Sequence, residues 1–382
     1  MGKQTFRLGR IFGLEISCNW SLILIFLLVA WTMATEVLPA AVPHQPTWAY
    51  WICGLAGAVA FYGGLLAHEV SHALVARSKG VTVTGITLWL FGGVTQLGTE
   101  TRSAADESLI TVVGPLTSLV IAGIGFGLSV GLSALGAPAL LVNLVAWLSL
   151  LNLVLGVFNL VPAIPLDGGR LLSSLLWWRT GSRERGVHRA VQVGRVFSGL
   201  VIGGGLVELF FGSLLSGIWL CFIGWFLYTA GGAEDRQVRI RSSLKSVLVA
   251  AAMTAPVATL PDWLAVDQLL GAGMGAARLP VYPLHDQAGN PSGFVSRQDL
   301  LGLRSAAELH RRLHDFAKPQ ESFPTAAPDE DLEAVLDRIG PALERGVLVM
   351  EGGRLVGVLS SFNVGQVAAL RQTVGPKPGL PA

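Results

Sequence analysis

Six long stretches of this chain contain almost no charged residue, and each is long enough to cross a membrane. A spanning α-helix needs about 20 consecutive, mainly apolar residues. The candidate spans are residues 18–38, 50–77, 107–133, 139–161, 190–209 and 212–230. Only 14% of the residues are charged and the net charge is +2, which gives no support to nucleic-acid binding. The sequence therefore predicts a polytopic α-helical membrane protein with about six transmembrane helices.

The basic residues of the connecting segments fall on alternate connections. Lysines and arginines precede the first apolar stretch and follow the second, the fourth and the sixth. The other connections, near residues 39–49, 134–138 and 209–213, contain neither residue type. Cytoplasmic connections of membrane proteins are enriched in Lys and Arg. This pattern predicts that both termini face the cytoplasm.

Residues 84–98 differ from the apolar stretches around them. Their sequence, TGITLWLFGGVTQLG, has a partly alternating pattern of apolar residues on either side of a Gly-Gly pair. Two short alternating runs around such a pair are typical of a β-hairpin. The alternative is an apolar loop at the membrane interface. We expect a short membrane-associated hairpin.

The part of the chain after residue 235 has an ordinary soluble composition. Residues 236–245 are charged and are expected to form a linker. Two halves follow, 246–303 and 317–372, and each contains a strand, a helix and then a strand pair. Two successive halves with the same order of elements indicate a repeated supersecondary unit. We expect a soluble α/β domain built from two similar halves.

The second apolar stretch contains the motif HEVSH, which includes His68, Glu69 and His72. Histidines four residues apart on a helix lie on one face and can bind the same ion. Neutral imidazole suits zinc, and Glu69 can take a proton from a water that the metal activates. The alternative is a structural polar cluster. Ionisable residues inside a membrane segment are costly and mark functional sites, so we predict a metal site.

A catalytic zinc usually has three protein ligands, and Asp167 is the best candidate for the third. Pro162 and Pro165 precede it and break the helix, which lets the chain fold back. Gly168 and Gly169 follow it and permit a tight turn and close backbone approach. The alternative is an ordinary Asp-Gly turn at the end of a helix. Together with the two histidines, Asp167 is expected to complete the metal site.

The motif HEVSH in one apolar stretch, with FNLVPAIPLDGGR after another, resembles the site-2 protease family of intramembrane zinc metalloproteases. The resemblance covers residues 1–235. Ala163 departs from the commoner, proline-rich form of the second motif. No PDZ-like insertion separates the two motifs, so the chain is similar to the compact branch of the family.

This resemblance implies a role for each motif residue. His68, His72 and Asp167 would be the ligands of one zinc ion per chain, and Glu69 would be the general base. Asn159 matches a motif asparagine that helps to stabilise the oxyanion. For Asn159 the alternative is an interhelical hydrogen bond.

The activity implied is that of a zinc metalloendopeptidase in a prokaryotic cell membrane. It would cleave membrane-anchored proteins within or near the bilayer, a process called regulated intramembrane proteolysis. The candidate substrates by resemblance are anti-sigma factors, membrane-bound transcription regulators and signal-peptide remnants. Two other functions fit an intramembrane His/Glu/Asp cluster. One is a membrane transporter or channel gated by the C-terminal domain, and the other is a catalytically inactive scaffold. The pairing of H-E-x-x-H with a distant D-G-G favours the protease.

The two C-terminal halves resemble a pair of cystathionine-β-synthase-type (CBS) domains, on the segments AMTAPVATLP, GFVSRQDLL and GVLSSFNV. Such pairs often bind ATP or AMP. By this resemblance Ser296 and Asp299 would contact the ribose and phosphates in the first half. In the second half Ser360 is followed by Asn363, which departs from the pattern. The alternative is a structural module or one that forms a homodimer.

Overall fold

The computed structural model describes residues 5–89, 92–97, 101, 103–271, 279–303 and 305–374. The chain divides into two compact units, Met1–Arg236 and Gln237–Ala382. Six helical segments among the described residues are long and apolar enough to cross a membrane. They are Ser21–Ala41, Thr47–Ser78, Ala104–Ala134, Ala139–Asn159, Arg183–Phe211 and Leu214–Ser243. The predicted fold class, a polytopic helical membrane protein with a C-terminal α/β domain, is confirmed.

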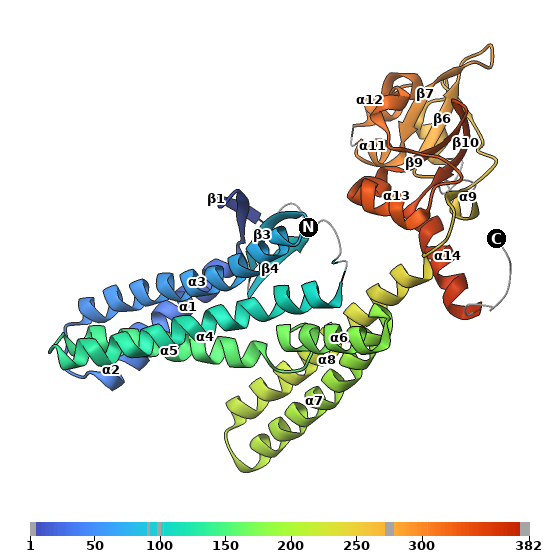
Figure 1. Cartoon of the computed structure of the whole chain (residues 1–382). Coiled ribbons are helices and arrows are strands. Elements are labelled where there is room, and N and C mark those ends of the chain that lie inside the picture. The colour runs from blue at the N-terminus through green and yellow to red at the C-terminus, as the bar shows by residue number, and fades with distance from the viewer. Residues whose placement is uncertain are drawn as a thin grey trace. The chain divides into compact units, whose positions relative to one another are not determined.

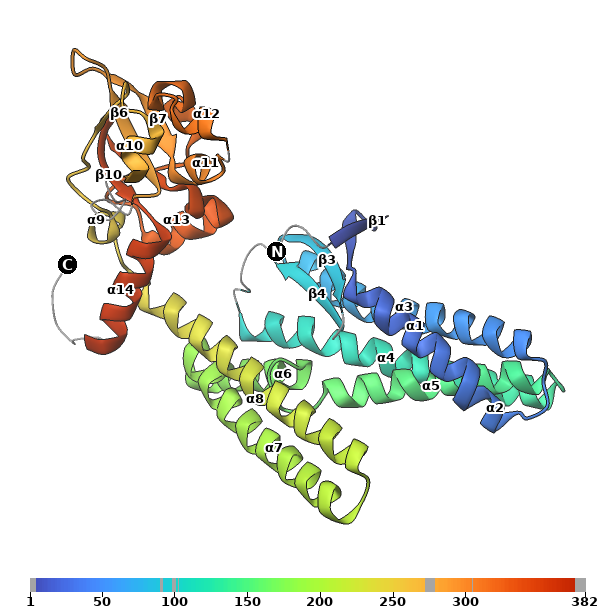
Figure 2. The same ribbon diagram turned by 180° about the vertical axis from the view of Figure 1, so that it is seen from behind.

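The first segment consists of α1 (Ser21–Thr32), a π-helical turn (Met33–Val37) and α2 (Leu38–Ala41). The helices α3 (Thr47–Ser78), α4 (Ala104–Ala134) and α5 (Ala139–Asn159) run side by side in both views (Figures 1 and 2). Then come α6 (Asp167–Thr180), α7 (Arg183–Phe211) and α8 (Leu214–Ser243). The short helix α6 was not predicted, because Gly168 and Gly169 in its first turn are poor helix formers.

The predicted linker at residues 236–245 is largely helical, because α8 continues to Ser243. Residues 233–243 contain no Gly or Pro and include glutamate, glutamine and arginine. These residue types have a high helix propensity, so the segment can be helical even though it has no pattern of apolar residues. The end of the hydrophobic stretch was therefore a poor marker for the end of the helix.

A four-stranded sheet accompanies α3 in the first unit. It contains β1 (Thr5–Ile11), β2 (Leu14–Asn19), β3 (Val83–Trp89) and β4 (Gly92–Leu97), in the order β1-β2-β3-β4. The antiparallel pair β3 and β4 is the predicted hairpin. The two N-terminal strands were missed, although the buried Leu14, Ile16 and Cys18 alternate with polar residues in β2. Such a period of two is the signal of a half-buried strand.

The sheet covers the end of α3 that carries the HEVSH motif. Leu14, Ile16, Val70 and Ala73 belong to one buried cluster. The guanidinium of Arg77, near the end of α3, donates hydrogen bonds to the backbone oxygens of the β1–β2 turn. This packing fixes the sheet against the helix that bears the two histidines.

The second unit contains two three-stranded sheets with the same topology. The first has β5 (Leu260–Pro261), β6 (Val281–His285) and β7 (Pro291–Ser296), and the second has β8 (Thr325–Ala326), β9 (Val347–Glu351) and β10 (Arg354–Leu359). In each sheet the first two strands are parallel and the last two antiparallel. The predicted repeat is therefore present in the structure.

Short helices surround these sheets. They are α9 (Val249–Ala252), α10 (Val266–Gly271), α11 (Arg297–Leu301), α12 (Ala306–Leu309), α13 (Leu332–Ile339) and α14 (Ser361–Val374), with 3-10 turns at Leu313–Phe316, Gln320–Ser322 and Gly340–Arg345. Arg241, at the end of α8, pairs with Glu333 and Asp337 of α13.

Candidate metal centre

Helix α3 brings the two histidines of HEVSH together. Their Nε2 atoms are 3.2 Å apart, because residues four apart lie on one face of a helix, one turn from each other. His68 is only 3% exposed and Glu69 is 9% exposed. The two imidazole rings therefore face one point inside the protein.

Asp167 is the first residue of α6, and its carboxylate faces the same point. Its Oδ2 atom lies 3.1 Å from Nε2 of His68 and 3.3 Å from Nε2 of His72. Helix α5 ends at Asn159, and residues 160–166 fold back so that α6 can begin beside α3. The hydroxyls of Ser108 on α4 and Ser174 on α6 are 2.7 Å apart and hold these two helices together.

The two positions after Asp167 require glycine, because backbone atoms of the preceding segment leave no room for a side chain there. A Cβ atom at Gly168 would lie 2.2 Å from the carbonyl oxygen of Leu160, and one at Gly169 would lie 2.3 Å from the nitrogen of Ile164. The buried Ala163 and Ile164 also lie against glycines of other helices. Cβ atoms at Gly194 of α7 and Gly231 of α8 would come within 3.2 Å of their backbone atoms. Close backbone packing therefore sets the position of Asp167.

The three side chains fit a zinc ion. Their ligand atoms all lie within 4.8 Å of one another, and the separations of 3.1, 3.2 and 3.3 Å are nearly equal. Tetrahedral ligands at about 2.0–2.1 Å from zinc are separated by about 3.3–3.4 Å. Burial opposes the charge on Asp167, but the two adjacent imidazoles outweigh it and hold the pKa of this carboxyl well below its usual range. The arrangement provides two nitrogen ligands and one anionic oxygen ligand.

Helix α4 lies directly against both histidines. Nδ1 of His68 is 2.9 Å from Oγ of Ser118, and Nδ1 of His72 is 2.6 Å from the carbonyl oxygen of Ile110. Between them, a Cβ atom at Gly114 would lie 2.1 Å from Nε2 of His72 and 2.7 Å from Nε2 of His68. Only glycine leaves that space open. Sequence reasoning missed these α4 residues, and the available signal was a Gly-Pro pair inside an apolar stretch.

Strand β4 lies against the glutamate of the motif. A Cβ atom at Gly93 would lie 2.3 Å from Cγ and 2.8 Å from Oε1 of Glu69. Strand β4 is also an edge of its sheet. The carboxylate thus lies next to the backbone of a strand that, among the described residues, pairs only with β3.

Asn159 is placed differently from the other motif residues. Its Nδ2 atom donates a hydrogen bond to the carbonyl oxygen of Leu155, in its own helix, at 2.9 Å. Among the described residues, no hydrogen bond joins it to His68, His72 or Asp167. The buried asparagine of α5 is Asn152, which is 2% exposed. Its side chain lies against Gly64 of α3.

The residues expected to bind a nucleotide lie in the second unit. Ser296 is buried, and its Oγ accepts a hydrogen bond from the backbone of Gln298 at 3.2 Å. Asp299 pairs with Lys318, with 2.6 Å between Oδ2 and Nζ. In the second half, the side chain of Asn363 contacts Ser360 and donates to the hydroxyl of Thr254 at 3.0 Å. Asn363 is therefore already bonded to Ser360 of its own half and to Thr254 of the first half.

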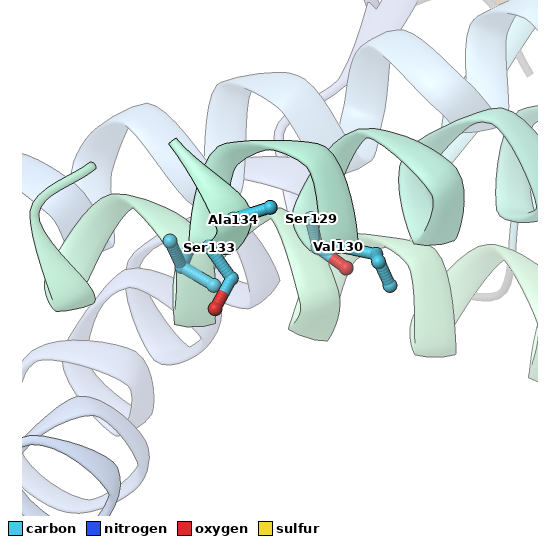
Figure 3. Close-up of a pocket in the computed structure, with 5 residues that line it drawn as sticks. Ser129, Val130, Ser133 and Ala134 are labelled. Atoms are coloured by element: carbon cyan, nitrogen blue, oxygen red, sulfur yellow. The ribbon is translucent and has the colours of Figure 1, made fainter. Parts of the chain in front are cut away.

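A shallow pocket elsewhere in the first unit has no chemical role that we can identify. Its lining residues are Ser129, Val130, Ser133, Ala134 and Val142 (Figure 3). It begins fifteen residues beyond Gly114 on α4, or about 22 Å along the helix. None of the lining residues is titratable, and neither His68, His72 nor Asp167 lines the pocket.

Comparisons with known proteins show which proteins this chain is similar to. The family model for peptidase family M50 matches residues 56–136 and 136–202. Rip3 of Mycobacterium tuberculosis (strain H37Rv), which is named as a zinc metalloprotease, is 38% identical over 377 residues, with 98% of this chain and 96% of that protein covered. The solved site-2 protease of Methanocaldococcus jannaschii is 28% identical, with coverage of 60% of this chain and 95% of that one and a TM-score of 0.40. The CBS domain of a bacterial CNNM/CorC family Mg²⁺ transporter is 17% identical, with coverage of 35% and 82% and a TM-score of 0.28.

Proposed function

Because this chain belongs to peptidase family M50, the zinc metalloproteases of the site-2 type, we propose that it cleaves membrane-anchored proteins within or at the edge of the bilayer. The observation that carries this proposal is the convergence of three ligand atoms, from His68, His72 and Asp167, beside Glu69. We propose that these three residues hold one zinc ion. The multi-pass helical architecture supports a substrate that is itself in the membrane.

Zinc, when bound, would supply a Lewis acid and lower the pKa of a water molecule to about 7. Glu69 would accept a proton from the attacking water as the oxygen of that water bonds to the substrate carbonyl carbon. The C–N bond would then break, and Glu69 would return the proton to the leaving nitrogen. Asn159 would support the developing oxyanion with the second N–H of its amide, since the first is donated to the carbonyl of Leu155.

The substrate would bind as an extended strand. In a membrane helix the peptide bonds are shielded by their own hydrogen bonds, so the segment to be cut must unwind. An extended segment can add to a free sheet edge, and β4 is such an edge beside Glu69. Pairing with β4 would place the substrate backbone next to the general base. Cross-linking of a trapped substrate to β4 rather than to β1, the opposite edge, is the measurement that checks this.

The zinc assignment is tested by metal analysis of the purified protein. We expect about one zinc per chain, the count of a single catalytic site, and loss of both metal and cleavage after treatment with a chelator. The His68→Ala variant should lose the zinc because it removes one of three ligands. His44→Asn is the matched control, since Asn tolerates the left-handed conformation of that exposed position, where φ is 64°. Full zinc in His68→Ala would contradict the assignment.

The C-terminal unit is proposed to bind an adenine nucleotide, ATP or AMP, in its first half at Ser296 and Asp299. The ammonium of Lys318 forms an ion pair with Asp299, and it could also contact a phosphate bound beside Asp299. The second half is a weaker candidate, because Asn363 already bonds to Ser360 and Thr254. A nucleotide that binds one state of the protease more tightly would shift the equilibrium toward that state. The size of this shift cannot exceed the difference in nucleotide affinity between the two states.

Nucleotide binding is expected to change the cleavage rate of the full-length protein, since allosteric coupling is typically about 1–3 kcal/mol, or roughly 5–150-fold in affinity. Asp299→Ala should weaken binding, whereas Asn363→Ala should leave it unchanged. Equilibrium binding to the solubilised full chain, with a cleavage assay in liposomes, measures both effects. Absence of binding at millimolar nucleotide would leave this unit as a structural or homodimerising module.

We also propose that both termini face the cytoplasm of a prokaryotic cell. The alternation of basic and uncharged connections supports this orientation. Labelling with an impermeant reagent measures it, by comparing a cysteine at His44 with one at Arg183. Membrane-bound transcription regulators, anti-sigma factors and signal-peptide remnants remain the candidate substrates, and trapping with an inactive variant would identify the one that binds.

A further inference from the structure

One face of α4 supports both histidines of the metal centre. Ile110, Gly114 and Ser118 are spaced four residues apart, so they lie on successive turns of the same side. His72 and His68 have the same spacing on α3. His72 contacts Ile110 and His68 contacts Ser118, while Gly114 leaves the space between them. Each histidine of α3 therefore faces a residue on a different turn of α4.

The two supporting groups differ in their chemistry. A backbone carbonyl only accepts hydrogen bonds, so the oxygen of Ile110 requires a proton on Nδ1 of His72 and leaves Nε2 of that ring free to bind a metal. A hydroxyl both accepts and donates. Ser118 can therefore accept a hydrogen bond from the protonated Nδ1 of His68, and this also leaves Nε2 of His68 free.

A competing arrangement exists for His68. Its Nε2 atom lies 3.1 Å from Oδ2 of Asp167, so a proton on Nε2 could be donated to the carboxylate. That tautomer has no lone pair on Nε2 and cannot bind zinc. With its oxygen as the acceptor, Ser118 opposes that tautomer by stabilising the proton on Nδ1. Ser118 is 0% exposed and His68 is 3% exposed, so bulk water does not reach the contact to replace a lost hydroxyl.

We propose that Ser118 is a positioning residue of the metal centre, which holds His68 in the tautomer that binds zinc. This inference rests on the proposed zinc site at His68, His72 and Asp167. A purely structural role for Ser118, as a link between α3 and α4, would have a different consequence. It would change the stability of the metal-free protein and leave zinc affinity alone.

The test compares zinc affinity and metal-free stability in the full-length protein. Loss of a hydrogen-bond partner of a metal ligand typically costs about 10–100-fold in metal affinity, and we expect Ser118→Ala to fall in that range. Ser118→Thr keeps the hydroxyl and should restore most of the affinity. Ser129→Ala is the matched control, because Ser129 is also a buried serine of α4 but donates only to Phe126 of its own helix, at 2.8 Å.

Zinc affinity is measured by competition with a chelator, and stability by thermal unfolding of the metal-free proteins. The absorption spectrum of bound Co²⁺ reports the ligand geometry independently of activity. A wild-type affinity in Ser118→Ala, or a loss that Ser118→Thr does not reverse, would overturn the role of Ser118. Failure of the wild-type protein itself to bind zinc would instead reject the proposed metal site.

Discussion

Replacement of Glu69 by glutamine is expected to leave zinc bound and to reduce cleavage by about 10²–10⁴-fold, the usual contribution of a general base. The amide has nearly the shape of the carboxylate but cannot accept the proton of water at neutral pH. Shape matters at this position, because Gly93 of β4 lies against the side chain of Glu69. A glutamine therefore preserves the packing of β4 while it removes the chemistry.

The measurement is cleavage of a membrane substrate in liposomes, with metal analysis of the same preparation. Glu36→Gln is a suitable control, since it makes the same change at an exposed position on another spanning segment. Cleavage by Glu69→Gln at the wild-type rate would remove Glu69 from the mechanism. Loss of zinc together with activity would assign this residue to metal binding instead.

The second large effect is expected at Gly114, where a single methyl group should abolish zinc binding. The added Cβ would lie 2.1 Å and 2.7 Å from the Nε2 atoms of His72 and His68. These separations are far inside van der Waals contact, so at least one imidazole must move away from the metal. Since His72 is also held by Ile110, the displacement would break that hydrogen bond too. Cleavage should fall with the zinc content.

Gly123→Ala provides the comparison for Gly114→Ala. It lies on the same helix, and an added Cβ there meets no other atom within 4 Å. Alanine is about 1 kcal/mol more favourable than glycine inside a helix, so this variant should fold and keep its zinc. Wild-type zinc content in Gly114→Ala would show that the two histidines do not meet at α4 as described.

The sequence predicts the spanning helices and singles out the three side chains that converge in the structure, because both depend on residue type. Apolar stretches identify the helices, and histidine and aspartate have few other reasons to lie in such surroundings. The end of α8 was missed since charged residues continue the helix beyond the apolar stretch. Strand β1 was missed because most of its side chains are exposed, so it carries no buried alternation.

The environment of the metal site was much harder to predict. Ile110 acts through its backbone carbonyl, which every residue has, and Ser118 is one of several serines in apolar helices. Gly93 and Gly114 matter because of what lies opposite them, and those neighbours come from α3. A local pattern does not reveal which turn of one helix meets which turn of another. Asn159 shows the converse, since its motif position is clear from the sequence while its side chain is bonded within α5.

Residues 160–166, which deliver Asp167 to the site, are enclosed by glycines from α6, α7 and α8. Each of those glycines limits how far the segment can shift. The tolerance of the enzyme to mutation should therefore be uneven in an unusual way. We expect exposed apolar side chains of the spanning helices to tolerate substitution, whereas the glycines packed against residues 160–166 determine the position of Asp167.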